Sequence, residues 1–159
     1  MFRPPPVHEV AERLIVGPCP ASPEIIARLR GEHGVGALVS LQTDGDLERS
    51  GLSWPLLWRF LVARGITPVR VPIIDFDDRS LLGRIDEAAD AVQHAHGRGD
   101  TVYLHCTAGV NRSPTVAIAW LVRHRGMSLD DAWEQVTTRR PCDPHRAVLE
   151  RWSGSVAKR

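Results

Sequence analysis

The chain has few cysteines, no long apolar run and no apolar signal segment, and each shortage excludes a class of protein. Its three cysteines, Cys19, Cys106 and Cys142, are an odd number without metal-ligand spacing, which argues against a disulfide framework and a zinc site. The longest strongly apolar stretch, residues 116–122, is far too short to span a bilayer. The first residues, MFRPPPVHEV, contain no signal peptide, so we expect a protein of the reducing cytoplasm.

An excess of charge of either sign is also missing. Lys plus Arg number 20 and Asp plus Glu 19, which leaves a net charge of +1. Such a balance supplies no global field that would favour nucleic acid or an anionic membrane. We therefore expect neither as a partner, and we expect a monomer in which any anion chemistry comes from a local site.

The length of the chain fits one domain, which we place at residues 11–155, after a leader over residues 1–10 stiffened by Pro4-Pro5-Pro6. The alternation of strand-like and helix-like segments predicts an α/β fold, with a central, mostly parallel sheet of about four to five strands flanked by helices. Ligands in such folds bind beyond the carboxyl ends of the strands. Apolar runs predict strands over 14–16, 37–41, 69–74 and 101–105, and amphipathic spacing and caps predict helices over 22–30, 54–63, 80–96, 112–125, 128–140 and from 143, with a polar loop over 42–49.

One stretch at such a strand end, YLHCTAGVNRSP at residues 103–114, carries what phosphate transfer to sulfur needs. Cys106 would be the nucleophile, because a helix N-terminus and nearby positive charge lower the pKa of a free cysteine from about 8.5. Gly109 permits a close backbone approach to phosphate that a side chain would obstruct. The inward-facing N–H groups of the loop would form an anion nest, contributed by Thr107, Ala108, Gly109, Val110 and Asn111.

Three neighbouring side chains complete the predicted site. Arg112 can donate two hydrogen bonds to phosphate oxygens through its planar fork, which lysine cannot match. Ser113 can hydrogen-bond the sulfur and stabilise the thiolate, and we expect His105 to order the loop through backbone carbonyls. Without such neighbours, a cysteine and an arginine six positions apart would be explained equally by a buried, inert cysteine at a turn.

The pattern H-C-x-x-G-x-x-R-S at residues 105–113 resembles the signature of the cysteine-dependent protein tyrosine phosphatases, and HCTAGVNRSP looks most like their dual-specificity branch. The resemblance implies a protein tyrosine phosphatase-like fold. It also implies hydrolysis of phosphotyrosine, phosphoserine or phosphothreonine in proteins through a phosphocysteine intermediate, without metal or cofactor. Asn111 departs from the branch, which often has Ser or Gly at this place.

A phosphatase of this type also needs a carboxylic acid that protonates the leaving oxygen and then activates water. The segment VPIIDFDD at residues 71–78 places acids directly after a predicted strand. The resemblance makes Asp75 the best match, with Asp77 as its rival. Asp78 is a further rival, but for both Asp77 and Asp78 we favour a solvated loop whose carboxylates stabilise the start of the next helix.

The order of motifs beyond the loop looks like laforin and the plant glucan phosphatases, which remove phosphate from glycogen or starch. Residues 14–17, 22–24, 41–47, 75–77 and 140–142 carry this resemblance. A phosphorylated carbohydrate is therefore the alternative substrate, with Phe76 at the place of one sugar-stacking aromatic. Arg49 and Ser50 stand where the plant enzymes present aromatic residues; Trp54 and Trp58 could compensate or pack in the interior, where we also expect Trp120 and Trp133.

Further alternatives remain from the residues alone. A phosphate-binding pseudophosphatase module would bind without turnover, but such modules usually lack the nucleophile, the arginine or the acid. Low-molecular-weight phosphatases and arsenate reductases carry their loop near the N-terminus, whereas this loop is central. Cys142 could form a regulatory disulfide with Cys106, or be a small residue in a turn. Arg139 and Arg140 could line the phosphate approach or lie in a solvated turn.

Overall fold

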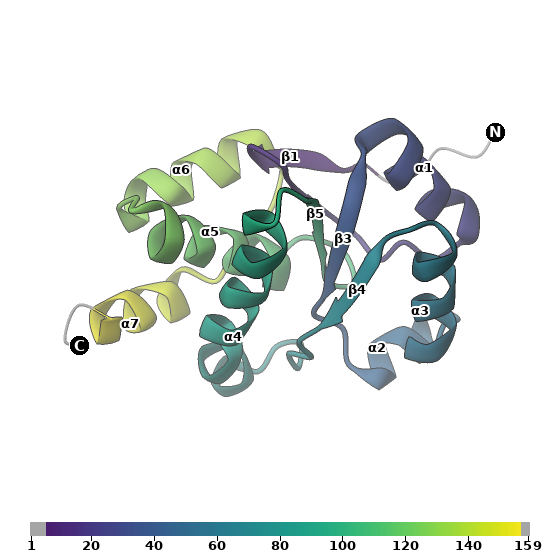
Figure 1. Ribbon diagram of the computed structural model, residues 1–159. Helices are drawn as coiled ribbons and strands as arrows, with labels where there is room; N and C mark the ends of the chain where they lie inside the picture. Colours follow the sequence, from purple (N-terminus) through teal and green to yellow (C-terminus); the bar gives the residue numbers. More distant parts are fainter. Residues whose placement is uncertain (1–5, 157–159) are drawn as a thin grey trace.

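The computed structural model describes residues 6–156, whose centre is a five-stranded sheet with the order β1-β2-β5-β3-β4 (Figure 1). Four strands run parallel, and β1 at one edge is antiparallel to β2. The mostly parallel α/β sheet predicted from the sequence is therefore confirmed. The strands are β1 (His8–Ala11), β2 (Leu14–Gly17), β3 (Val35–Ser40), β4 (Thr67–Arg70) and β5 (Thr101–His105).

Two apolar clusters, one on each face of the sheet, hold the helices in place. Along β5, Tyr103 belongs to one cluster whereas Val102 and Leu104 belong to the other, as the alternation of side chains in a strand requires. In the described residues, none of the helices combines the length and apolar character needed to cross a bilayer. One face carries α1 (Pro23–His33), α2 (Asp44–Arg49) and α3 (Trp54–Ala63), and the other α4 (Asp78–Gly97), α5 (Arg112–Arg125), α6 (Leu129–Arg139) and α7 (Arg146–Val156).

Side-chain caps explain where several helices begin. Ser22, Ser53 and Ser128 each accept a hydrogen bond from the backbone N–H three residues further on, at the start of α1, α3 and α6. Gly34 and Gly126 end α1 and α5 in the left-handed conformation, with φ of 66° and 69°, which glycine adopts without a Cβ penalty. These helices lie where the sequence predicted them, with α1 ending three residues later.

Two predictions along this part of the chain are wrong in their details. The expected polar loop over 42–49 contains α2, which a capping box between Thr43 and Asp46 stabilises. The strand expected over 69–74 is β4 at Thr67–Arg70, and beyond it Val71 N still donates to Ser40 O and Ile73 N to Leu41 O. Pro72 between them has no N–H to donate, which is tolerated because β4 is an edge strand of the sheet.

The N-terminal edge of the sheet includes residues that the sequence pattern placed in the leader. β1 begins at His8, which is paired with Val16 of β2. Its four residues, HEVA, include a charged residue and are too few to show an apolar alternation. Residues 1–5, which carry Pro4 and Pro5 of the expected stiff leader, lie outside the described residues.

Candidate active site

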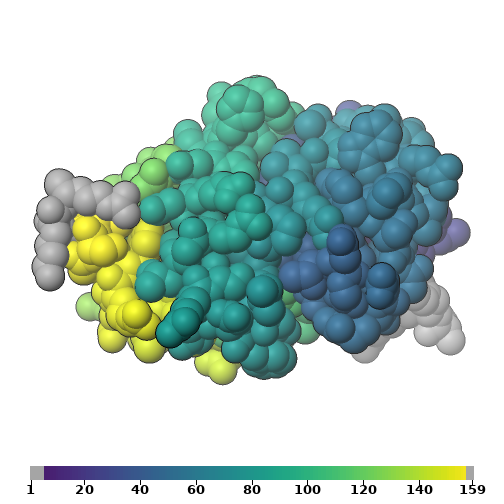
Figure 2. All heavy atoms as spheres, turned by 90° about the horizontal axis from the view of Figure 1, so that it is seen from below, coloured from purple at the N-terminus to yellow at the C-terminus, as the bar shows by residue number. Residues whose placement is uncertain are grey.

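The predicted site residues meet at the carboxyl ends of the parallel strands. Cys106 directly follows β5, and the chain enters α5 at Arg112 after one short loop. Seen from below, α4 (teal) occupies the middle of this side of the molecule, between α7 (yellow) and the segment around α2 (dark blue) (Figure 2). A pocket of about 180 Å³ opens there, lined by Asp75, Phe76, Cys106, Thr107, Ala108, Val110, Asn111 and Arg112.

The carbonyl groups of the loop are hydrogen-bonded by donors that lie outside it. Cys19 N donates to Thr107 O at 2.9 Å, Asp143 N to Val110 O at 2.7 Å, and Thr115 Oγ1 to Asn111 O at 2.7 Å. Within residues 6–156, the backbone N–H groups of residues 107–111 make no hydrogen bond to the protein. These donors are therefore free to bind an anion in the pocket.

Gly109 takes the left-handed conformation in this loop, with φ of 69°. A Cβ at this position would lie 2.6 Å from the backbone carbonyl of Gly17, at the end of β2. Glycine is thus needed for two reasons, since a side chain would strain the backbone and would also collide with the neighbouring strand.

The sulfur lies at the base of the pocket and is almost fully buried. Ser113 Oγ, in the first turn of α5, is 3.2 Å from Cys106 Sγ. His105 Nδ1 donates to Cys106 O at 2.9 Å, while its buried Nε2 has no hydrogen-bond partner in the part of the chain that the structure describes. Burial is the largest cause that lowers the pKa of His105 to about 4, so this ring is neutral at physiological pH and donates from Nδ1.

Arg112 is only 2% exposed, and its guanidinium links the loop to the chain at Ile73 and Asp75. Its Nη2 donates to Thr107 Oγ1 at 3.2 Å, its Nη1 to Ile73 O at 2.8 Å, and its Nε is 3.3 Å from Asp75 Oδ1. Nη1 also donates to Asp46 Oδ2 at 2.7 Å, so the positive charge of the buried arginine is balanced by the carboxylate of Asp46, which does not line the pocket.

Asp46 is a site residue that the sequence pattern did not reveal. It is buried at the start of α2, and burial alone would raise its pKa, but hydrogen bonds from Arg112 and Thr43 lower the pKa below its ordinary value. The only available signal was the capping box TDGD, which predicts a helix start and says nothing about a distant arginine.

The three acids of the acid segment, residues 74–78, have different surroundings. Asp75 lines the pocket beside Arg112. Asp77 caps α4 by accepting from Ser80 N at 2.9 Å, and Asp78 Oδ1 is 2.8 Å from His145 Nε2. The helix thus begins at Asp78, two residues before the expected start at residue 80, with Asp77 as its N-cap. This placement favours Asp75 over Asp77 as the acid that reaches a bound phosphate ester.

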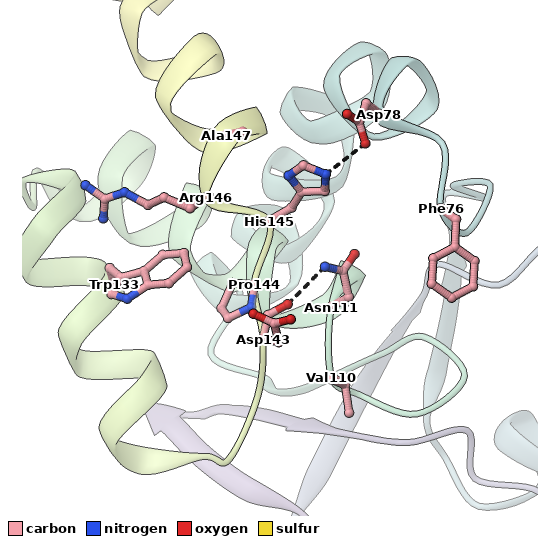
Figure 3. A pocket seen from close by; sticks show the side chains of 10 residues that line it. All are labelled: Phe76, Asp78, Val110, Asn111, Trp133, Asp143, Pro144, His145, Arg146 and Ala147. Carbon is pink, nitrogen blue, oxygen red and sulfur yellow. Dashed lines mark hydrogen bonds and ion pairs between the residues drawn. The ribbon is translucent and has the colours of Figure 1, made fainter.

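A wider groove of about 720 Å³ continues from the mouth of the pocket (Figure 3). Phe76, Val110 and Asn111 belong to both, and the Phe76 side chain is 97% exposed. Trp133, expected in the interior, packs against the core but is only half-buried. Its other side lines the groove, with the Arg146 guanidinium carbon 5.2 Å from the centre of the ring. Trp120, in contrast, is buried in the core as expected.

The other predicted aromatic and cysteine residues lie outside the pocket wall. Trp58 is exposed and Trp54 half-buried beneath the guanidinium of Arg70. All three cysteines are free thiols. Burial raises the pKa of Cys19 to about 11 and also raises that of Cys142. A redox disulfide between Cys142 and Cys106 stays a prediction.

Comparison with known proteins places these features in a family. The profile described as "Dual specificity phosphatase, catalytic domain" matches residues 41–149. Dual specificity phosphatase 28 of Mus musculus is 30% identical over 138 residues, which cover 87% of this chain and 76% of that protein. The crystal structure of human DUSP28 has a TM-score of 0.74 at 26% identity, covering 98% of this chain and 97% of the other.

Phosphoglucan phosphatase DSP4, amyloplastic, of Castanea sativa is 33% identical over 133 residues, which cover 82% of this chain. The chain spans 35% of that protein, and 11% and 20% of two further curated relatives, human dual specificity protein phosphatase 16 and Drosophila melanogaster dual specificity protein phosphatase Mpk3. The resemblance seen in the sequence is confirmed. The profile covers well over half of the chain, and the chain belongs to the dual-specificity phosphatase family.

Proposed function

We propose that this chain hydrolyses phosphomonoesters through a phosphocysteine intermediate, with phosphotyrosine, phosphoserine or phosphothreonine in proteins as substrate. One observation carries the proposal: Cys106, Arg112 and Asp75 line a single pocket, around which the N–H groups of residues 107–111 have no partner in the described protein. A nucleophile, an anion cradle and an acid are therefore within reach of one phosphate group.

In the first step, the Cys106 thiolate attacks phosphorus in line with the ester oxygen. The S–P bond forms as the P–O bond to the leaving group breaks, and the Asp75 carboxyl gives its proton to the leaving oxygen. The loop N–H groups and Arg112 hold the three remaining oxygens, because preformed donors stabilise the charge that develops in the transition state. Ser113, 3.2 Å from the sulfur, can stabilise the thiolate before the attack.

In the second step, water attacks phosphorus and the Asp75 carboxylate takes up its proton. The S–P bond breaks, inorganic phosphate leaves, and the Cys106 thiolate is regenerated. Each proton and electron pair is accounted for by these side chains and one water molecule, so the proposed cycle uses no metal or cofactor. The cycle needs Cys106 as a reduced thiol. We therefore propose that the protein acts in the cytoplasm or in a similarly reducing compartment.

A phosphorylated carbohydrate is the second candidate substrate, and Phe76 is the observation that favours it. Its ring is 97% exposed at the mouth of the pocket, where it could stack on a sugar ring. The phosphoglucan phosphatase named above is also among the relatives. A pseudophosphatase is disfavoured, since the nucleophile, the arginine and the acid line the same pocket.

A side-by-side assay on phosphotyrosine peptide, phosphoserine peptide and solubilised phosphoglucan tests both the activity and its substrate. We expect hydrolysis of the phosphopeptides, and a preference of about hundredfold in kcat/KM for one substrate would decide the class. Cys106→Ser is the matched control, which should abolish turnover while retaining oxyanion binding. Turnover by this variant would show that the proposed nucleophile is wrong.

A further inference from the structure

Arg140 lies behind the phosphate-binding loop, on the side opposite the pocket. It is the residue after α6, and it is only 5% exposed. Its Nε donates to Gly109 O at 2.8 Å and its Nη2 to Ala108 O at 3.4 Å. Arg140 does not line the pocket, so it does not line the path by which phosphate approaches. Because it is buried, it does not lie in a solvated turn either.

The two carbonyls at the centre of the loop depend on this arginine. Among the described residues, no other donor bonds to Ala108 O or Gly109 O. A loop that aims its N–H groups at an anion aims these carbonyls away from it, and the carbonyl of the buried Gly109 needs a donor there. Without Arg140, these carbonyls could regain hydrogen bonds only from water. The peptide groups would rotate toward the solvent, and this rotation would turn N–H donors away from the anion.

The arginine is itself held from the other side. Its Nη1 donates to Pro6 O at 3.0 Å and to His8 Nδ1 at 2.8 Å, at the start of β1. A Cβ on Gly109 would lie 2.7 Å from Arg140 Nη2, so the glycine also makes room for the guanidinium. Arg140 thus bridges the N-terminal edge of the sheet and the loop, with its geometry determined at both ends.

We infer that Arg140 is a positioning residue, which holds the loop carbonyls outward and thereby keeps the loop N–H groups in the anion-binding arrangement. This inference rests on the proposed function, because the bound anion is the substrate phosphate. It differs from a purely structural role in one respect: removing Arg140 should weaken oxyanion binding in protein that is still folded.

The test compares Arg140→Met with Arg13→Met. Arg13 is a matched control, since its Nη1 also donates to two backbone carbonyls, His96 O at 3.1 Å and Asp100 O at 2.9 Å. Asp100 directly precedes β5 and His96 lies in the last turn of α4, so this arginine is bound before the start of β5, whereas the loop follows its end. Tungstate, a phosphate-like oxyanion, is the probe, with its inhibition constant measured against hydrolysis of para-nitrophenyl phosphate and the folded fraction measured by circular dichroism.

We expect Arg140→Met to raise the tungstate inhibition constant and to lower kcat/KM at least about tenfold each, whereas Arg13→Met leaves both within about twofold. Alkylation of Cys106 by iodoacetate at about pH 6 should also slow in Arg140→Met, because loop N–H groups that turn away no longer stabilise the thiolate. Wild-type values for Arg140→Met, with only its melting temperature lowered, would overturn the inference.

If Arg140→Met does not fold, Arg140→Lys takes its place beside Arg13→Lys. A lysine has all its donors on one nitrogen and cannot reach the loop carbonyls and the acceptors at Pro6 and His8 together. Tungstate binding should therefore weaken by a smaller factor, and unchanged binding would overturn the inference. A wild-type chain that neither binds tungstate nor hydrolyses para-nitrophenyl phosphate would overturn the proposed function and this inference with it. An active wild type with an unaffected Arg140→Met would overturn the inference alone.

Discussion

The phosphate-binding loop and the acid segment meet in one pocket, but the protein holds them in different ways. The loop is surrounded by donors from the chain after β2, from α5 and from the chain after α6, and Cys106 and Arg112 are buried. The acid segment has Ile74 and Phe76 exposed and is held by its helix cap, the Ile74 N–Ser80 Oγ bond and the Asp78–His145 pair. The proposed anion site is thus built into the core, whereas Asp75, the proposed acid, is partly exposed at the surface.

This difference predicts that substitutions in the acid segment lower activity but leave stability nearly unchanged. Substitutions in and around the loop should lower both activity and stability. Asp75→Ala should lower kcat/KM by roughly 10²–10⁴-fold, because the leaving oxygen loses its proton donor. Its melting temperature should stay near that of the wild type, since the side chain is partly exposed. Steady-state kinetics with an alkyl phosphate substrate measure the first effect.

Asp77→Ala is the control for the acid. It removes the N-cap of α4, which costs about 1 kcal/mol of stability, while activity should fall less than tenfold. If instead Asp77→Ala loses activity and Asp75→Ala keeps it, Asp77 is the acid. Lining the pocket would then not identify the acid.

On the loop side, His105 should make the protein sensitive to acid. Its pKa is about 4 in the folded protein and 6.5 for the ordinary side chain, so between these values the unfolded chain binds a proton that the folded protein does not. The free energy of unfolding therefore has its full value above about pH 6.5. It decreases by about 3 kcal/mol in total as the pH falls from about 6.5 to about 4. Urea unfolding at a series of pH values measures this slope.

His105→Asn can still donate to Cys106 O but cannot titrate. The variant should be less stable at neutral pH, and its stability should fall less steeply than that of the wild type between about pH 6.5 and 4. Equal slopes for the two proteins would show that His105 is not the residue responsible for the acid sensitivity.

Asp46→Asn should have a smaller effect on stability, about 1–3 kcal/mol, because the buried Arg112 keeps an acceptor but loses its paired charge. The side chain of Arg49, which donates to the other oxygen of Asp46, is 72% exposed, so Arg49→Met should cost less than about 1 kcal/mol. Thermal unfolding of both variants makes the comparison. Equal losses would contradict the view that the buried pair stabilises the site.

Phe76→Ala should have the smallest effect and acts only through the substrate. If the ring stacks on sugar, kcat/KM on phosphoglucan falls about fivefold to tenfold, while hydrolysis of a phosphotyrosine peptide and the melting temperature stay unchanged. An equal loss on both substrates would assign Phe76 to the positioning of the acid segment instead of to carbohydrate binding.

The same comparison explains how much could be predicted from the sequence. The loop is one continuous stretch, so its nucleophile, glycine and arginine, and the strand and helix beside them, are visible as a pattern. Asp46 and Arg140 act on the site only through the fold, and neither has a local signal for that contact. The helix α2 was missed because Gly45 and two aspartates have low helix propensity, which the capping box and the pairing of Asp46 with Arg112 outweigh.

Direct detection of the phosphocysteine tests the central claim most sharply. Asp75→Ala, mixed with an aryl phosphate that needs no acid to leave, should accumulate the intermediate because water is no longer activated. After an acid quench, mass spectrometry of the tryptic peptides should show about 80 Da added at Cys106. Hydrolysis by the wild type without any adduct, or with an adduct on another residue, would contradict the account.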